Sequence, residues 1–174
     1  MYPPYQDNLI SERLVTRFLT EDDYTAWEEF VNDKDCLEFF SEVNHPTSAE
    51  RSKFFVGKSL DRYRENRFGL QALIDKNTNE LVGMSGLLSQ NVNGVMEIEI
   101  GYHLLKKHWR KGYAIEAANL FKQYVIDNNI AKSIVSIIHV NNINSKNVAL
   151  KNGMLPDGEV EFYGDPHIVY RIHL

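Results

Sequence analysis

The chain has 174 residues, and 43% of them are hydrophobic, which is enough for one globular core and requires no second domain. The formal net charge of −5 argues against nucleic acid as the main ligand. No apolar stretch approaches the roughly 20 residues of a membrane span, and the N-terminus lacks a secretory hydrophobic region, so we expect a cytoplasmic protein with no membrane partner. The one cysteine, Cys36, excludes an internal disulfide, and we interpret it as a structural thiol.

The first half of the chain predicts a strand, two helices and two further strands. Capping patterns and turn residues mark their ends, and apolar periodicity marks their buried faces. In order, the elements are a strand at Arg13–Phe18, a helix after the capping box of Thr20 and Asp23, a helix from Thr47 or Ser48 to about Asn66, and strands at 69–75 and 80–88. The preceding Tyr2-Pro3-Pro4-Tyr5 is predicted to be an extended, loosely held lead.

The second half of the chain alternates strands and helices. Asn93-Gly94 predicts a hairpin turn into the next strand. The elements that follow are a strand at 95–105, a helix at 114–127, a strand at 132–140, a short helix at about 145–151 that Gly153 ends, and two last strands between 159 and 174. Because no repeat, low-complexity tract or linker interrupts this order, we predict a single α/β domain over residues 1–174.

The most informative segment joins the strand Glu97–Tyr102 to the helix that begins near Ala114. The connection is short and basic, and it places Gly112 at the start of the helix. Unpaired backbone N–H groups and the helix dipole at such a turn suit a phosphate or pyrophosphate. Neither G-x-x-x-x-G-K-[ST] nor G-x-G-x-x-G is present, so the signal alone is weak, and a tight turn that binds nothing is the alternative.

Longer stretches of the chain carry a more specific pattern. Glu99-Ile100-Gly101-Tyr102-His103-Leu104 precedes residues 108–117, which read His-Trp-Arg-Lys-Gly-Tyr-Ala-Ile-Glu-Ala. In order and spacing they resemble E-I-G-Y-x-L and Y-W-G-K-G-Y-A-x-E-A of the GNAT superfamily of N-acetyltransferases, in its RimJ/RimL-like branch of ribosomal-protein N-terminal acetyltransferases. Residues 11–23 and 142–154 also resemble that family, the latter its N-x-x-S-x-x-V-x-x-K-x-G-[FM]. Arg110 departs from the pattern, because the branch usually has glycine there.

The resemblance implies a GNAT fold, with a mixed, mostly antiparallel central sheet flanked by helices. It also implies acetyl-CoA as co-substrate and transfer of the acetyl group to a primary amine, which attacks the thioester directly. The acceptor is a peptide, such as a protein N-terminus, or a small-molecule amine, and the protein is a monomer or a homodimer. The alternative is a non-catalytic acyl-CoA-binding regulator, and the retention of Glu99 and Ser145 favours the enzyme.

A carboxylate near the attack site is needed to take a proton from the amine. In this family a glutamate on the strand before the turn often serves as the base, so Glu99 is the first candidate and Glu97 the second. Alternation along the strand puts both on one face with Gly101 and His103, and we assign the opposite face to the core, with Met96, Ile98, Ile100 and Tyr102. The alternative for Glu99 is a solvated strand face or an ion pair with Arg67.

The acid that protonates the leaving thiolate is harder to place. Many members of the family use a tyrosine at the position that is Ala149 here, and the RimJ/RimL-like branch has a serine that falls at Ser145. The resemblance therefore implies that Ser145 protonates or hydrogen-bonds the thiolate, and an ordinary helix N-cap is the alternative. Asn142 is expected to bond the CoA arm or to hold the adjoining loop.

The remaining cofactor contacts are expected on two backbone segments. The N–H groups of Arg110, Lys111, Gly112, Tyr113 and Ala114 should hold the pyrophosphate, and the strand backbone at His103, Leu104 and Leu105 should pair with the pantetheine. Three lysines, Lys106, Lys107 and Lys111, either meet the 3′-phosphate or are simply solvated. The six histidines show no metal-ligand spacing, so we predict no metal.

Overall fold

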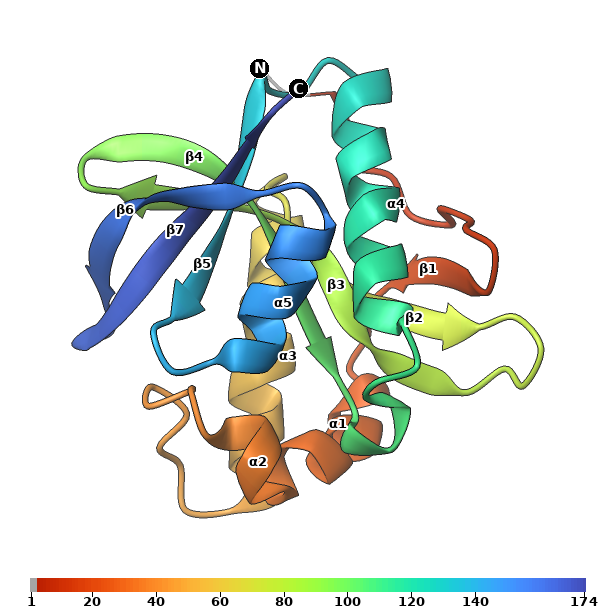
Figure 1. Cartoon of the computed structure of the whole chain (residues 1–174). Helices are drawn as coiled ribbons and strands as arrows, with labels where there is room; N and C mark the ends of the chain where they lie inside the picture. Colours follow the sequence, from red (N-terminus) through yellow and green to blue (C-terminus); the bar gives the residue numbers. More distant parts are fainter. Residues whose placement is uncertain (1–2) are drawn as a thin grey trace.

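The computed structural model describes residues 3–174, and its centre is a seven-stranded sheet with helices on both sides (Figure 1). The strands are β1 Leu14–Phe18, β2 Leu70–Asp75, β3 Leu81–Val92, β4 Val95–Leu104, β5 Ser133–His139, β6 Leu155–Phe162 and β7 Asp165–His173. The helices are α1 Asp23–Asn32, α2 Lys34–Leu37, α3 Ser48–Arg64, the 3₁₀ turn η1 Lys106–His108, α4 Tyr113–Asp127 and α5 Ile143–Lys151. The predicted strands and longer helices are therefore present, whereas α2 and η1 were not predicted.

The order of the strands is β1-β2-β3-β4-β5-β7-β6. All neighbours are antiparallel except β4 and β5, which run parallel. The expected mixed, mostly antiparallel sheet is thus confirmed. The hairpin at Asn93-Gly94 is confirmed as well, since both residues have positive φ and Val92 pairs with Val95 across the turn.

Local side-chain bonds explain where the helices begin and end. Thr47 and Glu50 form a reciprocal capping box at the start of α3, as predicted. The predicted box at Thr20 is wrong: Asp22 is the N-cap of α1 and makes no side-chain cap, although the Asp23 carboxylate accepts from the Thr20 N–H and from Arg17. Gly153 follows α5 with a φ of 84°, which suits glycine at a helix end and confirms the predicted stop.

The lead before β1 is held more firmly than predicted. Tyr5 packs edge-on against Phe68 and Tyr124, and its hydroxyl accepts from the Leu87 N–H. The expectation of a loose lead is therefore wrong for Tyr5, because an aromatic side chain fills the gap between β3 and α4. Met1 and Tyr2 lie outside the described residues.

Strand β4 runs through the middle of the sheet and is covered on both faces. Ile98 and Ile100 pack in one core cluster with Phe121 of α4. The ring of His103, on the opposite face, contacts Phe30 of α1 and Phe55 of α3. The predicted core face is therefore correct for Ile98 and Ile100. It is wrong for Met96, which is 62% exposed beside the hairpin turn.

Strands β4 and β5 separate soon after they meet. Within residues 3–174 they are paired at Glu99 and Val135, after which β4 stays with β3 and β5 stays with β7. Figure 1 shows the two arrows running in the same direction and moving apart, with α5 lying between them. The sheet is therefore open at the carboxyl ends of these two strands, and this opening positions the candidate site.

Candidate active site

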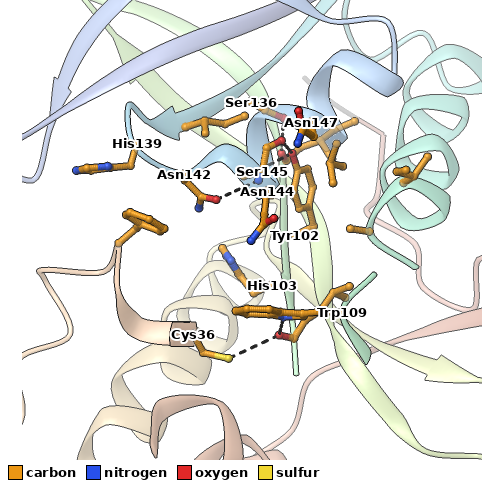
Figure 2. Close-up of a pocket in the computed structure, with 18 of the residues that line it drawn as sticks. Cys36, Tyr102, His103, Trp109, Ser136, His139, Asn142, Asn144, Ser145 and Asn147 are labelled. Atoms are coloured by element: carbon orange, nitrogen blue, oxygen red, sulfur yellow. Dashed lines mark hydrogen bonds between the residues drawn. The ribbon is translucent and has the colours of Figure 1, made fainter. Parts of the chain in front are cut away.

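A cavity of about 700 Å³ fills the opening between β4 and β5. Its walls come from the ends of both strands, the N-termini of α4 and α5, and the segment 35–40. Figure 2 shows Tyr102 and Ser145 on one side of the cavity and His103 and Cys36 on the other. Because Tyr102 and His103 are neighbours on β4 and point to opposite faces of the sheet, the cavity passes through the sheet from the α4 side to the α1–α3 side.

The N-terminus of α4 opens into this cavity. Gly112 precedes the helix with a φ of 85°, in the left-handed region that favours glycine, and it supplies no side-chain cap. The first backbone bond of the helix runs from the Glu116 N–H to the Gly112 carbonyl, so the three preceding N–H groups, on 113–115, have no partner within the helix. These residues line the cavity. A Cβ at Gly112 would lie 3.3 Å from the Arg13 guanidinium, so the turn is closely packed. This is a fitting cradle for a pyrophosphate.

An ion pair between α4 and the segment just before β1 holds the cradle in place. The Glu116 carboxylate accepts hydrogen bonds from the Ser11 hydroxyl (2.6 Å), the Arg13 N–H (2.6 Å) and the Arg13 Nε (2.7 Å). These bonds hold the pKa of Glu116 below its usual range against the opposing effect of burial. Arg13 also donates to the Lys111 carbonyl at 2.8 Å. The glutamate of the A-x-E-A motif therefore ties the turn to the sheet.

The side chains around the cradle are less involved than its backbone. Arg110 lines the cavity and has a φ of 61°, a left-handed conformation that is strained for an arginine and natural for the glycine that the branch usually has there. Lys106 pairs with Asp33 and Asp35, and Lys107 pairs with Glu29. Both lysines are thus engaged with carboxylates of the protein.

The strand backbone expected to meet pantetheine is partly occupied. The Leu104 carbonyl accepts from the Trp109 indole at 2.8 Å, and the Leu105 N–H donates to Val82. His103 and Leu104 line the cavity, whereas Leu105 is buried in the core beside it. The Ile100 carbonyl points toward β5, where it accepts from Ser136. Because backbone groups alternate along a strand, those of Tyr102 face the same open side.

Glu99 is a buried carboxylate at the point where the strands part. Its side chain is 8% exposed and lines the cavity. One oxygen accepts from the Gln90 amide at 2.9 Å and the other from the Ile137 N–H at 3.3 Å. Burial raises the pKa of Glu99, while these bonds and the nearby Arg62 charge oppose the rise. The alternatives of a solvated face and of a pair with Arg67 are both wrong, since Arg67 pairs with Glu65.

Glu97 lies away from this site. Its carboxylate accepts from Arg171 at 2.8 and 3.0 Å, which joins β4 to β7. The residues that line the cavity include Glu99 and not Glu97. The second glutamate of the strand is therefore held in an ion pair outside the cavity.

The phenol of Tyr102, a residue that the sequence analysis assigned to the core, lines the cavity. Its hydroxyl donates to the Ser145 carbonyl at 3.0 Å and accepts from the Ser145 hydroxyl at 3.3 Å. Burial raises the pKa of Tyr102 to about 12, so the phenol keeps its proton at neutral pH. The core assignment holds in part, because the ring packs against the core cluster that includes Phe121 of α4, but the sheet opens beside Tyr102 and the residue also lines the cavity. A tyrosine within the E-I-G-Y motif was the available signal.

Asn142, and not Ser145, caps the N-terminus of α5. Asn142 is the N-cap of α5, and its side-chain oxygen accepts from the Ser145 N–H at 3.0 Å. Ser145 is therefore inside the helix, and its interpretation as an N-cap is wrong. Both residues line the cavity, and Figure 2 shows them beside Asn144 and Asn147.

His103 and Cys36 complete the α1–α3 side. The imidazole of His103 contacts the rings of Phe30, Phe40 and Phe55, and burial lowers its pKa to about 4. The Cys36 thiol is buried, lies 4.0 Å from the Leu104 carbonyl and has a pKa raised to about 11, which fits a structural thiol. Among residues 3–174 no group of three histidine, cysteine or acidic side chains is arranged to hold a metal ion.

A sequence profile described as an acetyltransferase (GNAT) domain matches residues 13–155. The chain belongs to the GNAT acetyltransferase family. Two Bacillus subtilis proteins are similar to it along most of their length: uncharacterized protein YkkB (27% identity, 93% of each chain) and uncharacterized N-acetyltransferase YoaA (24% identity, 89% of this chain and 86% of YoaA). The buried carboxylate and the helix-terminal cradle are therefore the candidate active site of an acetyltransferase.

Solved structures share the fold over nearly the whole chain. An acetyltransferase from Agrobacterium tumefaciens superposes with a TM-score of 0.78 at 24% identity and covers 100% of this chain and 98% of its own. RimL, a ribosomal L7/L12 alpha-N-protein acetyltransferase in complex with coenzyme A, gives 0.77 at 16% identity, covering 97% and 98%. The microcin C7 self immunity acetyltransferase MccE, in complex with acetyl-CoA and AMP, gives 0.75 at 17% identity, covering 96% and 99%. No helix in residues 3–174 has the length and apolar character of a membrane span.

Proposed function

We propose that this chain transfers the acetyl group of acetyl-CoA to a primary amine, which attacks the thioester directly. The observation that carries the proposal is one continuous cavity that joins the α4 cradle, the buried Glu99 carboxylate and the Tyr102–Ser145 pair. The CoA complexes of RimL and MccE, which share the fold, support acetyl-CoA as co-substrate. We keep the expectations of a single domain over residues 1–174 and of a cytoplasmic location as part of this proposal.

Glu99 acts as the general base in this proposal. The amine forms a C–N bond to the acetyl carbon while the C–S bond to CoA breaks, and Glu99 takes the proton that the amine releases, directly or through a water. A carboxylate with a raised pKa is better matched to this task near neutral pH than an ordinary one. Its two hydrogen bonds, from Gln90 and Ile137, keep it aimed into the cavity.

Tyr102 gives a proton to the departing sulfur, with Ser145 as its positioning partner. The phenol is protonated at neutral pH, lines the cavity and lies on the same face of β4 as α4, where the cradle is. The Ser145 hydroxyl bonds to the phenol oxygen. The resemblance assigned this step to Ser145 itself. With either hydroxyl as the proton donor, the products are the free thiol of CoA and the N-acetylated amide.

Two measurements on the purified chain test the proposal. Calorimetry should give micromolar-range binding of acetyl-CoA, and release of free CoA should be measured against a panel of peptides and small amines. Acetyl-CoA binding without transfer to any amine would favour the alternative of an acyl-CoA-binding regulator. No binding at millimolar acetyl-CoA would contradict both.

A further inference from the structure

A second, smaller cavity adjoins the first on the α1–α3 side of the sheet. Its volume is about 150 Å³, room for about five waters or for a molecule the size of a small amino acid. The two cavities share Glu99 and His103, so a ligand in the smaller one lies next to the proposed base. Aromatic side chains form much of its wall, from Phe39, Phe40, Phe55, Phe162 and Tyr163.

Arg62 of α3 lines this small cavity and has an unmet hydrogen-bonding requirement. Its Nη1 is buried without a hydrogen-bond partner within residues 3–174, and the guanidinium forms no ion pair there. The Arg62 side chain as a whole is half-buried, but a buried N–H donor without a partner has lost its hydration without compensation. Burial lowers the pKa of Arg62, and the negative charge of Glu99 partly offsets this. An anion brought by a ligand would supply the missing partner.

The other charged groups of the small cavity are already engaged. Lys58 pairs with Glu42 at 3.5 Å and lies over the ring of Phe54. Asp165 accepts from the Ser41 hydroxyl at 2.6 Å. The cavity therefore presents a dipole to a ligand, with the Glu99 carboxylate toward the larger cavity and the Arg62 guanidinium as the cation with an open donor.

We infer that the acceptor is a small amine that carries a carboxylate a few bonds from the nitrogen, as in a free amino acid, and that Arg62 binds this carboxylate. The inference rests on the proposed acetyl transfer, because it places the amine of the same molecule beside Glu99. An arginine–carboxylate pair is strong and directional, so it fixes which amine reaches the acetyl group. The small volume favours a free amino acid over an extended peptide.

The test compares α-amino acids with the matching α-amides, which keep the amine and the side chain and lack the negative charge. In the wild-type chain, kcat/KM should be about 10- to 100-fold higher for the acids. Arg62→Met keeps the length of the side chain and should bring this ratio near one, while Arg62→Lys should keep part of it. Arg64→Met is the matched control. Arg64 lies on the same helix, but it pairs with Asp61 outside the cavity, so its loss should leave the ratio of kcat/KM for acids over amides unchanged.

Binding measurements separate this inference from the proposed transfer. Calorimetric titration of each acid into the CoA-loaded protein should show binding that is lost in Arg62→Met, whether or not turnover occurs. Melting temperature and acetyl-CoA affinity of Arg62→Met verify that the fold and the cradle are intact. Equal kcat/KM for acids and amides in the wild type, a ratio that survives Arg62→Met, or transfer confined to peptides would each overturn the inference. A wild-type chain that does not bind acetyl-CoA would instead count against the proposed function.

Discussion

Glu99 pairs with Val135 at the point where β4 and β5 part, so one carboxylate reaches both cavities of the site. Tyr102 lies three residues further along β4 and points to the opposite face of the sheet. The proton acceptor and the proton donor that we propose thus lie on the two sides of one opening. Direct acetyl transfer needs a group that takes the proton of the attacking amine, and a second group that protonates the departing thiolate assists it.

Replacing Glu99 by Gln keeps the shape and removes the base. Turnover should fall by about 10²- to 10⁴-fold with acetyl-CoA affinity nearly unchanged, because the carboxylate acts on the amine and not on the cradle. Steady-state release of CoA, with calorimetry of acetyl-CoA binding, measures both. Since burial raises the pKa of Glu99, the acidic limb of kcat/KM in the wild type should lie above the pH range of an ordinary glutamate. An unchanged profile in Glu99→Gln would exclude this residue as the base.

Removing the phenol oxygen tests the acid. Tyr102→Phe should lower kcat by about 10²-fold or more, and Ser145→Ala should lower it less, because Ser145 acts through the phenol. The double variant should be no slower than Tyr102→Phe, since the two hydroxyls act on one step. Single-turnover kinetics measure the chemical step. A Ser145→Ala defect larger than that of Tyr102→Phe would make the serine the proton donor.

Much of this fold was predictable because its elements carry local signals. The capping box at Thr47, the Asn93-Gly94 turn and the apolar face of α4 each depend on neighbours in the sequence, and each is observed. The short α2 and η1 were missed because so few residues carry too weak a periodic signal. The mixed, mostly antiparallel sheet came from the family resemblance, and the parallel pairing of β4 with β5 was not predicted, since no local pattern encodes which strands meet.

The site was predictable where it is made of backbone and less so where it is made of side chains. Gly112 and the start of α4 follow from a motif, and their positions agree with it. Tyr102 packs against the core as predicted, but its place in the cavity wall was missed, because alternation tells which face a side chain takes and not what lies beyond that face. Arg62 carries no motif at all. The role that we infer for it depends on Arg62 and Glu99, 37 positions apart in the sequence, lining one cavity, which only tertiary structure reveals.

The left-handed Arg110 predicts a stabilising substitution. Arg110→Gly should raise the free energy of unfolding by up to about 1 kcal/mol, or the melting temperature by about 2–4 °C, because glycine adopts a φ of 61° without steric cost. Arg110→Ala is the control: it removes the same charge, keeps the strain and should not stabilise. Equal melting temperatures for the two variants would show that the strain is not released. Comparing the acetyl-CoA affinity of Arg110→Ala with that of the wild type then isolates the effect of the charge, because both keep the strained backbone.

Two substitutions in the cradle should abolish cofactor binding for different reasons. Gly112→Val fills the turn beside Arg13 and also strains a backbone at φ 85°, so it should cost stability as well as affinity, and a fold left intact is not expected. Ala114→Glu places a carboxylate at the first turn of α4 in a helical conformation that glutamate accepts. It should leave the melting temperature nearly unchanged while acetyl-CoA binding is lost. Normal acetyl-CoA affinity in Ala114→Glu would place the pyrophosphate elsewhere.

His103 makes the stability of the protein depend on pH. Its pKa falls from 6.5 in the unfolded chain to about 4 in the folded one, so the folded state binds fewer protons in this window. The free energy of unfolding is therefore unaffected by His103 above pH 6.5 and decreases as the pH falls toward 4. The decrease is at most about 3 kcal/mol, and it is smaller to the extent that solvent reaches the ring. Urea unfolding of the wild type and of His103→Leu, from pH 7 to pH 4, measures the difference, and taking the difference cancels the carboxylates that titrate in both.

The leucine variant should lose stability less steeply than the wild type over that range, since it has nothing to protonate in the aromatic cage of Phe30, Phe40 and Phe55. Imidazole proton shifts from NMR provide the direct check: the ring should stay neutral at pH 5. A ring that titrates near pH 6.5, together with parallel unfolding curves for the two proteins, would mean that water hydrates His103 fully. Because a pKa of about 4 makes the His103 imidazole a weak base, Glu99, whose pKa is raised, remains the base that we propose for this face.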